Sequence, residues 1–381
     1  MKLALIQDQL LTPAGSERVF LYMAQEFPEA DIFTLAYNPD TTWPEFKAFD
    51  IRTSWLNRWV QNHDRFKTAF PLSTYVMQNW DFDAYDVILT SSATTAKYIR
   101  NHHARHICYC YYPTRAIWTR NKYFDGAKSG LRETLFDMAY GALKRRDLEA
   151  AKRVDRFIAI SDSTRQAIRQ FYGRESEVLF SPIDVERFAA GASATKTGRY
   201  LMVGRLERWK RADFAIEAFN RLGLPLDVIG TGPEEAVLRA AANDNIRFLG
   251  RADDQTLVKA YGAARAVIFT PELEYGLVPL EAAAAGTPTI ALGKGGVLET
   301  MIGPEDAAGR APTAVFFTEQ SPEALIAAVR RFEGMEFQEK ALLAHAARFG
   351  IAEFRRKLRA FVADDMASLS QQAASNKMKQ T

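Results

Sequence analysis

The chain contains few cysteines and no long apolar run, and each shortage excludes a class of protein. Cys108 and Cys110 are the only cysteines among 381 residues. They stand one residue apart in an apolar run, so we expect them on one face of a strand rather than in a disulfide framework. This indicates a reducing compartment such as the cytoplasm, and two cysteines offer too few ligands for a metal site.

Membrane spans and targeting segments are not predicted either. No run reaches the roughly 18 apolar residues that a transmembrane helix requires. The segment 1–8 becomes polar too early for a signal peptide and is typical of a first strand.

The chain also lacks a large net charge, which is only +3, but its positive charge is unevenly distributed. Segment 97–146 contains eleven lysines and arginines and three acidic residues, interleaved with aromatic side chains. Such a surface suits an anionic membrane or a phosphorylated acceptor, and it could equally suit nucleic acid or be a solvated basic face. We expect peripheral contact with an anionic membrane, helped by Trp55, Arg58 and Trp59, and no nucleic acid partner.

Length and composition predict two globular domains of the α/β class. Hydrophobic residues make up 48% of the chain and charged residues 25%, as in soluble globular proteins, and 381 residues suffice for two cores. We interpret the low-complexity stretch 189–194 as a linker. The predicted boundaries are 1–188 for the first domain, 198–365 for the second and 366–381 for a polar tail. The last helix could cross back to the first domain.

Apolar runs alternate with helical patterns in both halves, which predicts parallel sheets. Helices are expected at 16–26, with Ser16 as N-cap, and from Ser161 to Phe171, ended by Gly173. The expected strands are 2–6, 31–36, 86–90, 106–111, 156–160, 177–180, 199–204, 225–229, 246–249, 266–270 and 287–292.

The stretch TPELEYGLVPLEAAAAGTPTIALGKGG, residues 270–296, is the first candidate site. It consists of a strand end, a turn at 274–277, a predicted helix from Pro279 to Ala285 stopped by Gly286, and another strand. Ligands of parallel sheets bind where strands end and helices begin, and the N–H groups of a helix start favour an anion. The turn is therefore a candidate phosphate site, with Glu281 expected in the first helical turn.

Three further segments are expected at the same edge of the second sheet. Arg205 and Lys210 follow its first strand, and guanidinium and ammonium groups neutralise a diphosphate without a metal. The turn IGTGP (229–233) lacks the third glycine of a dinucleotide fingerprint and is a weak signal. Arg251 ends the strand that begins at Ile246.

These motifs together resemble a known family. GRLERWKR, IGTGPEEAVL, IRFLGRADDQTL and EYGLVPLEAAAAGTPTIALGKGGVLET are similar to the donor-binding half of the retaining GT-B glycosyltransferases of family 4, and TPAGSERV resembles the glycine loop of their first half. The resemblance covers about residues 1–365. It implies two Rossmann-like domains with parallel sheets facing an interdomain cleft. The subgroup resembled is that of mannosyltransferase-like enzymes of O-antigen, capsule and exopolysaccharide assembly.

The resemblance also implies roles for individual residues. Arg205 and Lys210, with Gly204 beside them, would hold the donor diphosphate, and Glu281 would accept hydrogen bonds from the ribose. N–H groups in the turn of Tyr275, Gly276 and Leu277, and that of Gly15 from the first domain, would bind phosphate and sugar. Arg251 would lie against the nucleobase. The simpler interpretations are surface charges for Arg205, Lys210 and Arg251, and a carboxylate that stabilises a helix start for Glu281.

Two positions depart from the family pattern. Leu273 stands where the family usually has a glutamate that binds the donor sugar, between Glu272 and Glu274. Either one of these glutamates, with Glu274 as the catalytic candidate, reaches in from its shifted position, or the donor is a deoxy or amino-deoxy sugar. The histidine usual before the proline of CYYPTRAIW is also missing, with Tyr111 and Tyr112 in that region.

The resulting hypothesis is a cytoplasmic hexosyltransferase with peripheral membrane contact. It would transfer mannose or a related deoxy or amino-deoxy sugar from a nucleotide-sugar donor, GDP-linked rather than UDP-linked, to a lipid-linked saccharide in surface polysaccharide synthesis. No cofactor and no metal are expected. The alternatives are a nucleotide-sugar-binding subunit without turnover, which Leu273 would favour, and a nicotinamide oxidoreductase, which the missing G-x-G-x-x-G after the first strand disfavours.

Overall fold

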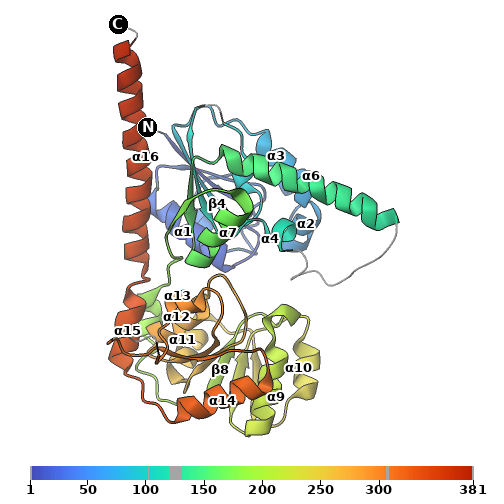
Figure 1. Ribbon diagram of the computed structural model, residues 1–381, viewed down its shortest axis with the longest axis vertical. Coiled ribbons are helices and arrows are strands. Elements are labelled where there is room, and N and C mark those ends of the chain that lie inside the picture. Colours follow the sequence, from blue (N-terminus) through green and yellow to red (C-terminus); the bar gives the residue numbers. More distant parts are fainter. Residues whose placement is uncertain (1, 102, 120–130, 306–308, 380–381) are drawn as a thin grey trace. The chain divides into compact units, whose positions relative to one another are not determined.

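The computed structural model describes residues 2–101, 103–119, 131–305 and 309–379 and divides into two compact units (Figure 1). The first consists of 1–180 and 354–381, and the second of 181–353. Within the described residues, none of the helices combines the length and apolar character that a bilayer crossing needs.

The first unit contains a seven-stranded parallel sheet of order β3-β2-β1-β4-β5-β6-β7. Its strands are β1 Leu3–Gln7, β2 Asp31–Thr34, β3 Ile51–Thr53, β4 Val87–Ser92, β5 Arg105–Cys110, β6 Arg156–Ala159 and β7 Ser176–Val178. Its helices are α1 Gly15–Glu26, η1 Pro44–Ala48, η2 Trp55–Arg58, α2 His63–Thr68, α3 Phe70–Gln78, η3 Ala96–Tyr98, α4 Arg115–Trp118, α6 Leu131–Arg153 and α7 Asp162–Tyr172.

The second unit contains a six-stranded parallel sheet of order β10-β9-β8-β11-β12-β13. Its strands are β8 Tyr200–Val203, β9 Leu226–Ile229, β10 Ile246–Gly250, β11 Val267–Phe269, β12 Thr289–Leu292 and β13 Ala314–Phe317. Its helices are α8 Val185–Ala189, η4 Arg208–Lys210, α9 Ala212–Leu222, α10 Glu235–Ala241, α11 Asp254–Ala263, α12 Leu277–Ala284, α13 Val297–Thr300, α14 Pro322–Glu333 and α15 Glu339–Ala347.

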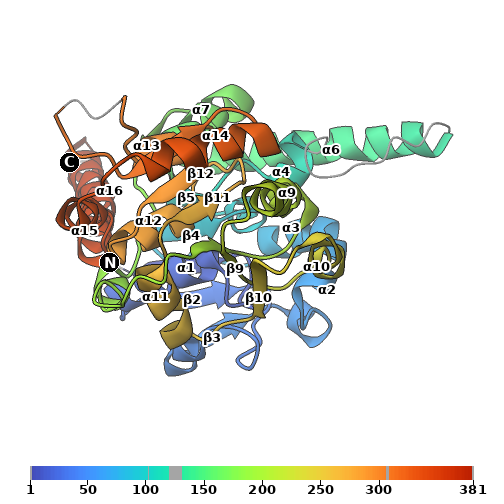
Figure 2. The ribbon, with the colours of Figure 1, turned by 90° about the horizontal axis from the view of Figure 1, so that it is seen from below.

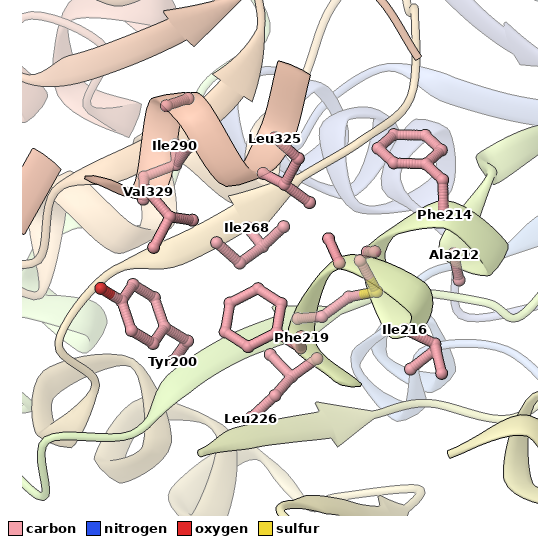
Figure 3. Packing of buried hydrophobic residues seen from close by; sticks show 14 of the residues in the cluster. Tyr200, Ala212, Phe214, Ile216, Phe219, Leu226, Ile268, Ile290, Leu325 and Val329 are labelled. Atoms are coloured by element: carbon pink, nitrogen blue, oxygen red, sulfur yellow. The ribbon is translucent and has the colours of Figure 1, made fainter. Parts of the chain in front are cut away.

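Helices cover both faces of the second sheet, which is why its strands read as continuous apolar runs rather than alternating ones. Helices α9 and α14 pack together on one face, and α8, α11, α12 and α15 pack on the other (Figures 1 and 2). On the α9 face, Phe219 contacts the ring of Tyr200 with centroids 5.1 Å apart, among Leu226, Ile268 and Val329 (Figure 3). This core fixes the strand ends that carry the candidate site.

The last helix, α16 Ile351–Lys379, belongs to the first unit from residue 354 onward. Asp365 is buried there and accepts hydrogen bonds from Arg105 at 2.8 Å and Arg156 at 3.1 Å. Arg359 pairs with Glu26 at the end of α1. A buried carboxylate shared by two guanidinium groups is a strong attachment, and it returns the chain to the unit where it began.

The sequence predicted most strands, but it misplaced one helix cap and missed two strands. Ser161 caps α7 by accepting from the Thr164 N–H, and Gly173 ends it at φ 64°, as predicted. By contrast, α1 begins at Gly15, so Ser16 is not its N-cap, and the Ser16 hydroxyl donates to Glu17 instead. Strands β3 and β13 were not predicted.

Stretch 189–194 is not a flexible linker. A Cβ on Gly191 would lie 2.4 Å from the Val258 carbonyl oxygen, and one on Gly262 would lie 1.7 Å from the Gly191 carbonyl oxygen. The small residues therefore serve a close backbone crossing against α11 rather than mobility. The chain divides before α8, at Phe180 and Ser181, and not at the predicted residues 188 and 198.

Candidate functional site

The candidate site of the second unit lies at the switch point of its sheet. The strand order reverses between β8 and β11, and in open α/β sheets ligands bind beyond the carboxyl ends of strands at such a point. The segments that follow these two strands are 204–211 and 270–276. The sequence predicted both segments as parts of the site, and the strands before them, β8 and β11, are paired neighbours in the sheet.

The segment after β8 brings Arg205 and Lys210 to this edge. Gly204 has φ 151°, and the Lys210 Nζ lies 3.3 Å from where a Gly204 Cβ would be. The Thr270 hydroxyl, just after β11, donates to the Lys210 carbonyl oxygen at 2.7 Å. Arg205 is exposed and pairs with Glu207 at 2.7 Å. The turn is thus fixed to the neighbouring strand while its guanidinium group faces solvent.

Lys210 carries its charge in an unfavourable environment. Burial first, and then the positive charge of Arg205, lower the pKa of the Lys210 ammonium group, and Glu207 opposes them. An anion bound between two such cations would remove their repulsion and restore the lost solvation. The arrangement therefore favours a diphosphate over a neutral ligand.

The residue after Lys210 is held in a rare conformation. Arg211 has φ 56° and is the non-glycine residue with positive φ in the described chain. It ends η4 and starts α9, and its side chain pairs with Asp213 at 3.0 Å. A left-handed non-glycine residue costs about 1 kcal/mol or more, and such strain concentrates at functional sites.

The turn GTG at 230–232 has a packing role. A Cβ on Gly230 would lie 1.9 Å from the Gly204 carbonyl oxygen, and one on Gly232 would lie 2.3 Å from that of Leu206. The Leu206 N–H also donates to the Thr231 carbonyl at 2.9 Å. These glycines let the turn after β9 press against the turn that carries Arg205, which explains why no third glycine is needed.

The loop after β11 rests on a second glycine turn that the sequence interpretation had missed. Leu273 forms an isolated bridge with Gly295, and the Gly296 N–H donates to the Leu273 carbonyl at 2.8 Å. Added Cβ atoms on Gly295 and Gly296 would lie 2.3 and 2.1 Å from the carbonyl oxygens of Leu273 and Glu274. In the sequence, the glycines of GKGG at 293–296 could have indicated this turn.

Within this loop Glu274 is buried, whereas Leu273 and Glu272 are half-buried. Tyr275 donates a hydrogen bond to the Ser181 carbonyl at 2.6 Å. Gly276 is the N-cap of α12, and a Cβ there would lie 2.9 Å from the Phe269 ring, so a larger residue would require this ring to shift. The first N–H groups of α12, beginning at Leu277, have no acceptor within the helix and suit an anion.

Glu281 lies in the second turn of α12, because the helix begins at Leu277 rather than at Pro279 as predicted from sequence. The Tyr261 hydroxyl donates to Glu281 Oε2 at 2.7 Å, and in the described chain no group donates to Oε1. Burial raises the pKa of the Glu281 carboxyl, and the Tyr261 hydrogen bond and the charge of Arg187 oppose it. In the second helical turn, the helix dipole does little to explain this half-buried carboxylate.

The remaining predicted residues stand apart from this group. Arg251 is exposed after β10, and no ion pair or hydrogen bond joins its side chain to the described residues. Gly15 is the first residue of α1 in the first unit. A cavity of about 320 Å³ opens beside the β8 turn, yet it is lined by Glu207, Arg208, Arg211, Ala212, Asp213, Glu234 and Leu238 and not by Lys210 or Glu281. The roles of Arg251 and Gly15 stay predictions.

The basic and aromatic segment 97–146 is only partly a surface. Lys97 is fully buried and pairs with buried Asp147 at 3.0 Å, and buried Tyr109 donates to the Leu179 carbonyl. Trp118 also donates to Asp147, at 2.6 Å. The expectation of a continuous basic face is wrong for these residues, and 120–130 lie outside the described chain.

The fold and this edge define the class of protein: two doubly wound α/β units of the GT-B type, one of which gathers cations and a carboxylate at its switch point. Two family models match, "Glycosyltransferase Family 4" over residues 13–187 and "Glycosyl transferases group 1" over 184–348. The chain therefore belongs to the GT-B glycosyltransferases of family 4.

Individual relatives are similar over less than half of the chain. A glycogen synthase of Mycobacterium tuberculosis is 33% identical over 177 residues, 42% of this chain and 43% of the relative. A D-rhamnosyltransferase of Pseudomonas aeruginosa is 30% identical over 155 residues, 36% and 40%. A mannosylfructose-phosphate synthase of Agrobacterium fabrum is 29% identical over 154 residues, 39% and 32%. The chain thus matches less than half the length of these curated relatives.

Solved structures are similar over nearly the whole chain. A sucrose-phosphate synthase from Thermosynechococcus elongatus has a TM-score of 0.70 at 15% identity, covering 97% of this chain and 100% of that one. The Anabaena protein HepE in complex with UDP has a TM-score of 0.65 at 15% identity, covering 96% and 100%. At such identity the likeness shows the fold alone.

Proposed function

We propose that the protein is a retaining hexosyltransferase that uses a nucleotide diphosphate sugar. The observation that carries this proposal is that Arg205, Lys210 and Glu281 lie on the segments that follow β8 and β11, the two strands at the switch point of one sheet. Departure of the nucleoside diphosphate develops negative charge on the leaving oxygen, which the two cations and the N–H groups at the start of α12 would stabilise. Glu281, fixed by Tyr261, would accept hydrogen bonds from the ribose through Oε1.

We further propose a GDP-linked donor that carries mannose or a deoxy or amino-deoxy hexose. The names of two relatives, a D-rhamnosyltransferase and a mannosylfructose-phosphate synthase, support a sugar of this kind. The opposing candidate is a UDP-sugar, since HepE was solved with UDP-glucose. Arg251 would contact the base, Gly15 the donor from the first unit, and neither a cofactor nor a metal would take part.

A thermal-shift panel of GDP-, UDP-, ADP- and dTDP-sugars tests donor binding. A donor at about 100 times its Kd stabilises the native state by about 2.7 kcal/mol, so the correct base should stand out as a rise in Tm. The Arg205→Ala and Lys210→Ala variants should lose that rise. If no nucleotide sugar shifts the Tm, the proposed donor site is wrong.

The acceptor we propose is a lipid-linked saccharide, reached by peripheral contact with an anionic membrane. The exposed aromatics of the first unit support this contact. Trp55 and Trp59 are 55% and 66% exposed, with ring centroids 5.9 Å apart. Arg58 and Arg65 beside them are exposed, and no carboxylate of the described chain lies within ion-pair distance of either. Tryptophan beside arginine that has no carboxylate partner among the described residues suits the interface of an anionic bilayer.

Liposome flotation tests this contact. Binding to acidic liposomes should fall as salt rises, and the double variant Trp55→Ser/Trp59→Ser should lose most of it. Val237→Ser, which removes an exposed apolar side chain of the second unit, is the matched control. Equal binding to neutral liposomes, or unchanged binding by the double variant, would contradict the proposal.

The competing function is a nucleotide-sugar-binding subunit without turnover, and the observation in its favour is Leu273 in place of the usual glutamate. Both functions predict donor binding, but only the enzyme predicts slow hydrolysis of the donor without acceptor. Release of free nucleotide from the donor that gives the Tm rise would therefore decide between them.

A further inference from the structure

A buried carboxyl group, that of Glu17, lies at the switch point of the first sheet. The strand order there reverses between β1 and β4, and Glu17 is in the first turn of α1, which follows β1. Its Oε2 accepts from the Ser16 hydroxyl at 2.7 Å, and its Oε1 accepts from Thr12 at 3.4 Å and from Gln9 at 3.3 Å. The carboxyl thus holds both ends of the loop 12–16.

Glu17 faces no cation at contact distance. Within the described chain no lysine or arginine forms an ion pair with it, and Arg18 turns away to Glu45. The charged and titratable groups around it are Asp8 after β1, Tyr111 after β5 and, through Gln9, His63 on α2. Burial first, assisted by the charge of Asp8, raises the pKa of Glu17 to about 7. Its proton is therefore exchanged near neutral pH.

The Gln9 amide joins Glu17 to His63. Its Nε2 lies 3.3 Å from Glu17 Oε1 and 2.9 Å from His63 Nδ1, while its Oε1 is buried and unpaired among the described residues. This orientation is satisfied when Glu17 is ionised and His63 Nδ1 carries no proton. The opposite orientation, with Oε1 facing both groups, is satisfied when both carry a proton. The Gln9 amide therefore favours two states, one in which neither Glu17 nor His63 Nδ1 carries a proton and one in which both do.

We propose that Glu17 is a positioning residue for sugar transfer, which in its ionised form holds the loop 12–16 in the shape that presents the Gly15 N–H. An ionised carboxylate makes stronger hydrogen bonds to Thr12 and Ser16 than a neutral acid does. The Tyr111 hydroxyl fixes the same loop from its backbone side by donating to the Ser16 carbonyl at 2.9 Å. When Glu17 takes up a proton and Gln9 reorients, the attachment of the loop through the Glu17 carboxylate becomes weaker. The proposal rests on the proposed function, because Gly15 matters only if the donor binds there.

The first test is the pH profile of transfer with the donor found by the Tm panel. In the wild type, kcat/KM should rise between pH 6 and 8 as Glu17 ionises. Glu17→Gln should lower kcat/KM at pH 8 by about 10- to 100-fold, the range that a displaced loop produces, and should flatten the profile. Glu17→Asp should keep the pH dependence with a partly restored rate, and Glu29→Gln, an exposed site just after α1, should follow the wild type. An equal loss at every pH, or an unchanged profile, would overturn the proposal.

The second test does not require transfer. NMR titration of the His63 side chain should show a steeper transition in the wild type than in Glu17→Gln, because the Gln9 amide favours states in which both groups change protonation together. His345, which belongs to the second unit, is the internal control. Identical His63 curves in both proteins would overturn the link through Gln9. If no donor is turned over but the His63 curves differ, the proposed function fails while the link stands.

Discussion

Each sheet has a carboxyl group near its switch point, buried Glu17 in the first unit and half-buried Glu281 in the second, and the two groups are held in different ways. In the second unit, burial raises the pKa of Glu281, and a hydrogen bond from Tyr261 and the charge of Arg187 oppose this rise. In the first unit, Glu17 receives hydrogen bonds from neutral side chains and faces Asp8, so its pKa rises to about 7. Similar topology thus supports a carboxylate suited to accept ligand hydrogen bonds in one unit and a proton-exchanging acid in the other.

The largest expected effect concerns anion binding by Arg205 and Lys210 at the edge of the second sheet. Arg205→Ala and Lys210→Ala should each lower kcat by about 10²- to 10³-fold, the usual loss when one donor to a developing negative charge is removed. Both side chains lie at a strand edge outside the core, so circular dichroism should not change. Arg208→Ala, an exposed neighbour in the same turn, is the control. Near-normal turnover in either variant would mean that this edge does not bind the diphosphate.

A second prediction concerns Glu281. A hydrogen bond to a charged group contributes about 1.5–3 kcal/mol, so Glu281→Gln should weaken donor binding by roughly 10- to 100-fold, with a smaller loss for Tyr261→Phe. Calorimetry with the intact donor and with its 2′,3′-dideoxy analogue would locate the effect. The variant and the wild type should bind the analogue equally well, because the ribose hydroxyls are absent. A constant difference between the two proteins would place Glu281 away from the ribose.

A third prediction uses the raised pKa of Glu17 and needs no substrate. An acid whose folded pKa is raised stabilises the protein fully below its unfolded pKa of 4.5, and this contribution is lost as pH rises through about 7. Glu17→Gln does not titrate. Relative to wild type it should therefore be more stable at pH 8 than at pH 4.5, by about 2–3 kcal/mol at about 1.4 kcal/mol per pKa unit.

Urea unfolding at the two pH values measures this difference, with Glu29→Gln as control. A variant that is more stable yet slower would show that the wild type keeps an unfavourable buried charge for function. Parallel stability curves for variant and wild type would show instead that Glu17 is solvated like an ordinary glutamate.

Sequence reasoning was most successful where a pattern has a local physical cause. The strand after Arg199, the caps at Ser161 and Gly173, and the turn before α12 depend on neighbouring residues, and the structure contains them. The fold class followed from the alternation of strands and helices. The grouping of Arg205 and Lys210 next to the loop after β11 depended on the parallel order that this alternation implies.

The features that were missed depend on distant packing. Nothing local distinguishes Gly191 in an alanine-rich stretch from a linker glycine, because its reason is the backbone of α11. The burial of Lys97 depends on Asp147, fifty positions along the chain, which neutralises it. The sequence shows Glu17 only as part of a glycine loop, because its hydrogen bond from Gln9, and the one between Gln9 and His63 on α2, form only in the folded chain.

The smallest expected effect concerns Leu273, in the loop after β11. Its backbone is fixed by Gly295 and Gly296, so Leu273 does not slip along the loop to let Glu274 take its place. Glu274 is nevertheless the more buried of the two residues, which suits a carboxylate that receives hydrogen bonds. Either Glu274 binds the donor sugar, or the apolar Leu273 side chain selects a sugar that lacks a hydroxyl there.

Two variants separate these possibilities. If Leu273 selects the sugar, Leu273→Glu should improve use of GDP-mannose relative to a 6-deoxy or 4-amino donor by about 10-fold or less, because apolar pockets discriminate weakly between sugars that differ by one hydroxyl. Glu274→Ala should then change turnover little. If instead Glu274→Ala abolishes transfer and Leu273→Glu leaves the donor ranking unchanged, Glu274 is the sugar-binding carboxylate and the deoxy-sugar proposal is wrong. Because Gly295 and Gly296 fix the backbone of Leu273 and Glu274, replacing either side chain should leave the other in place, and each variant reports on one side chain.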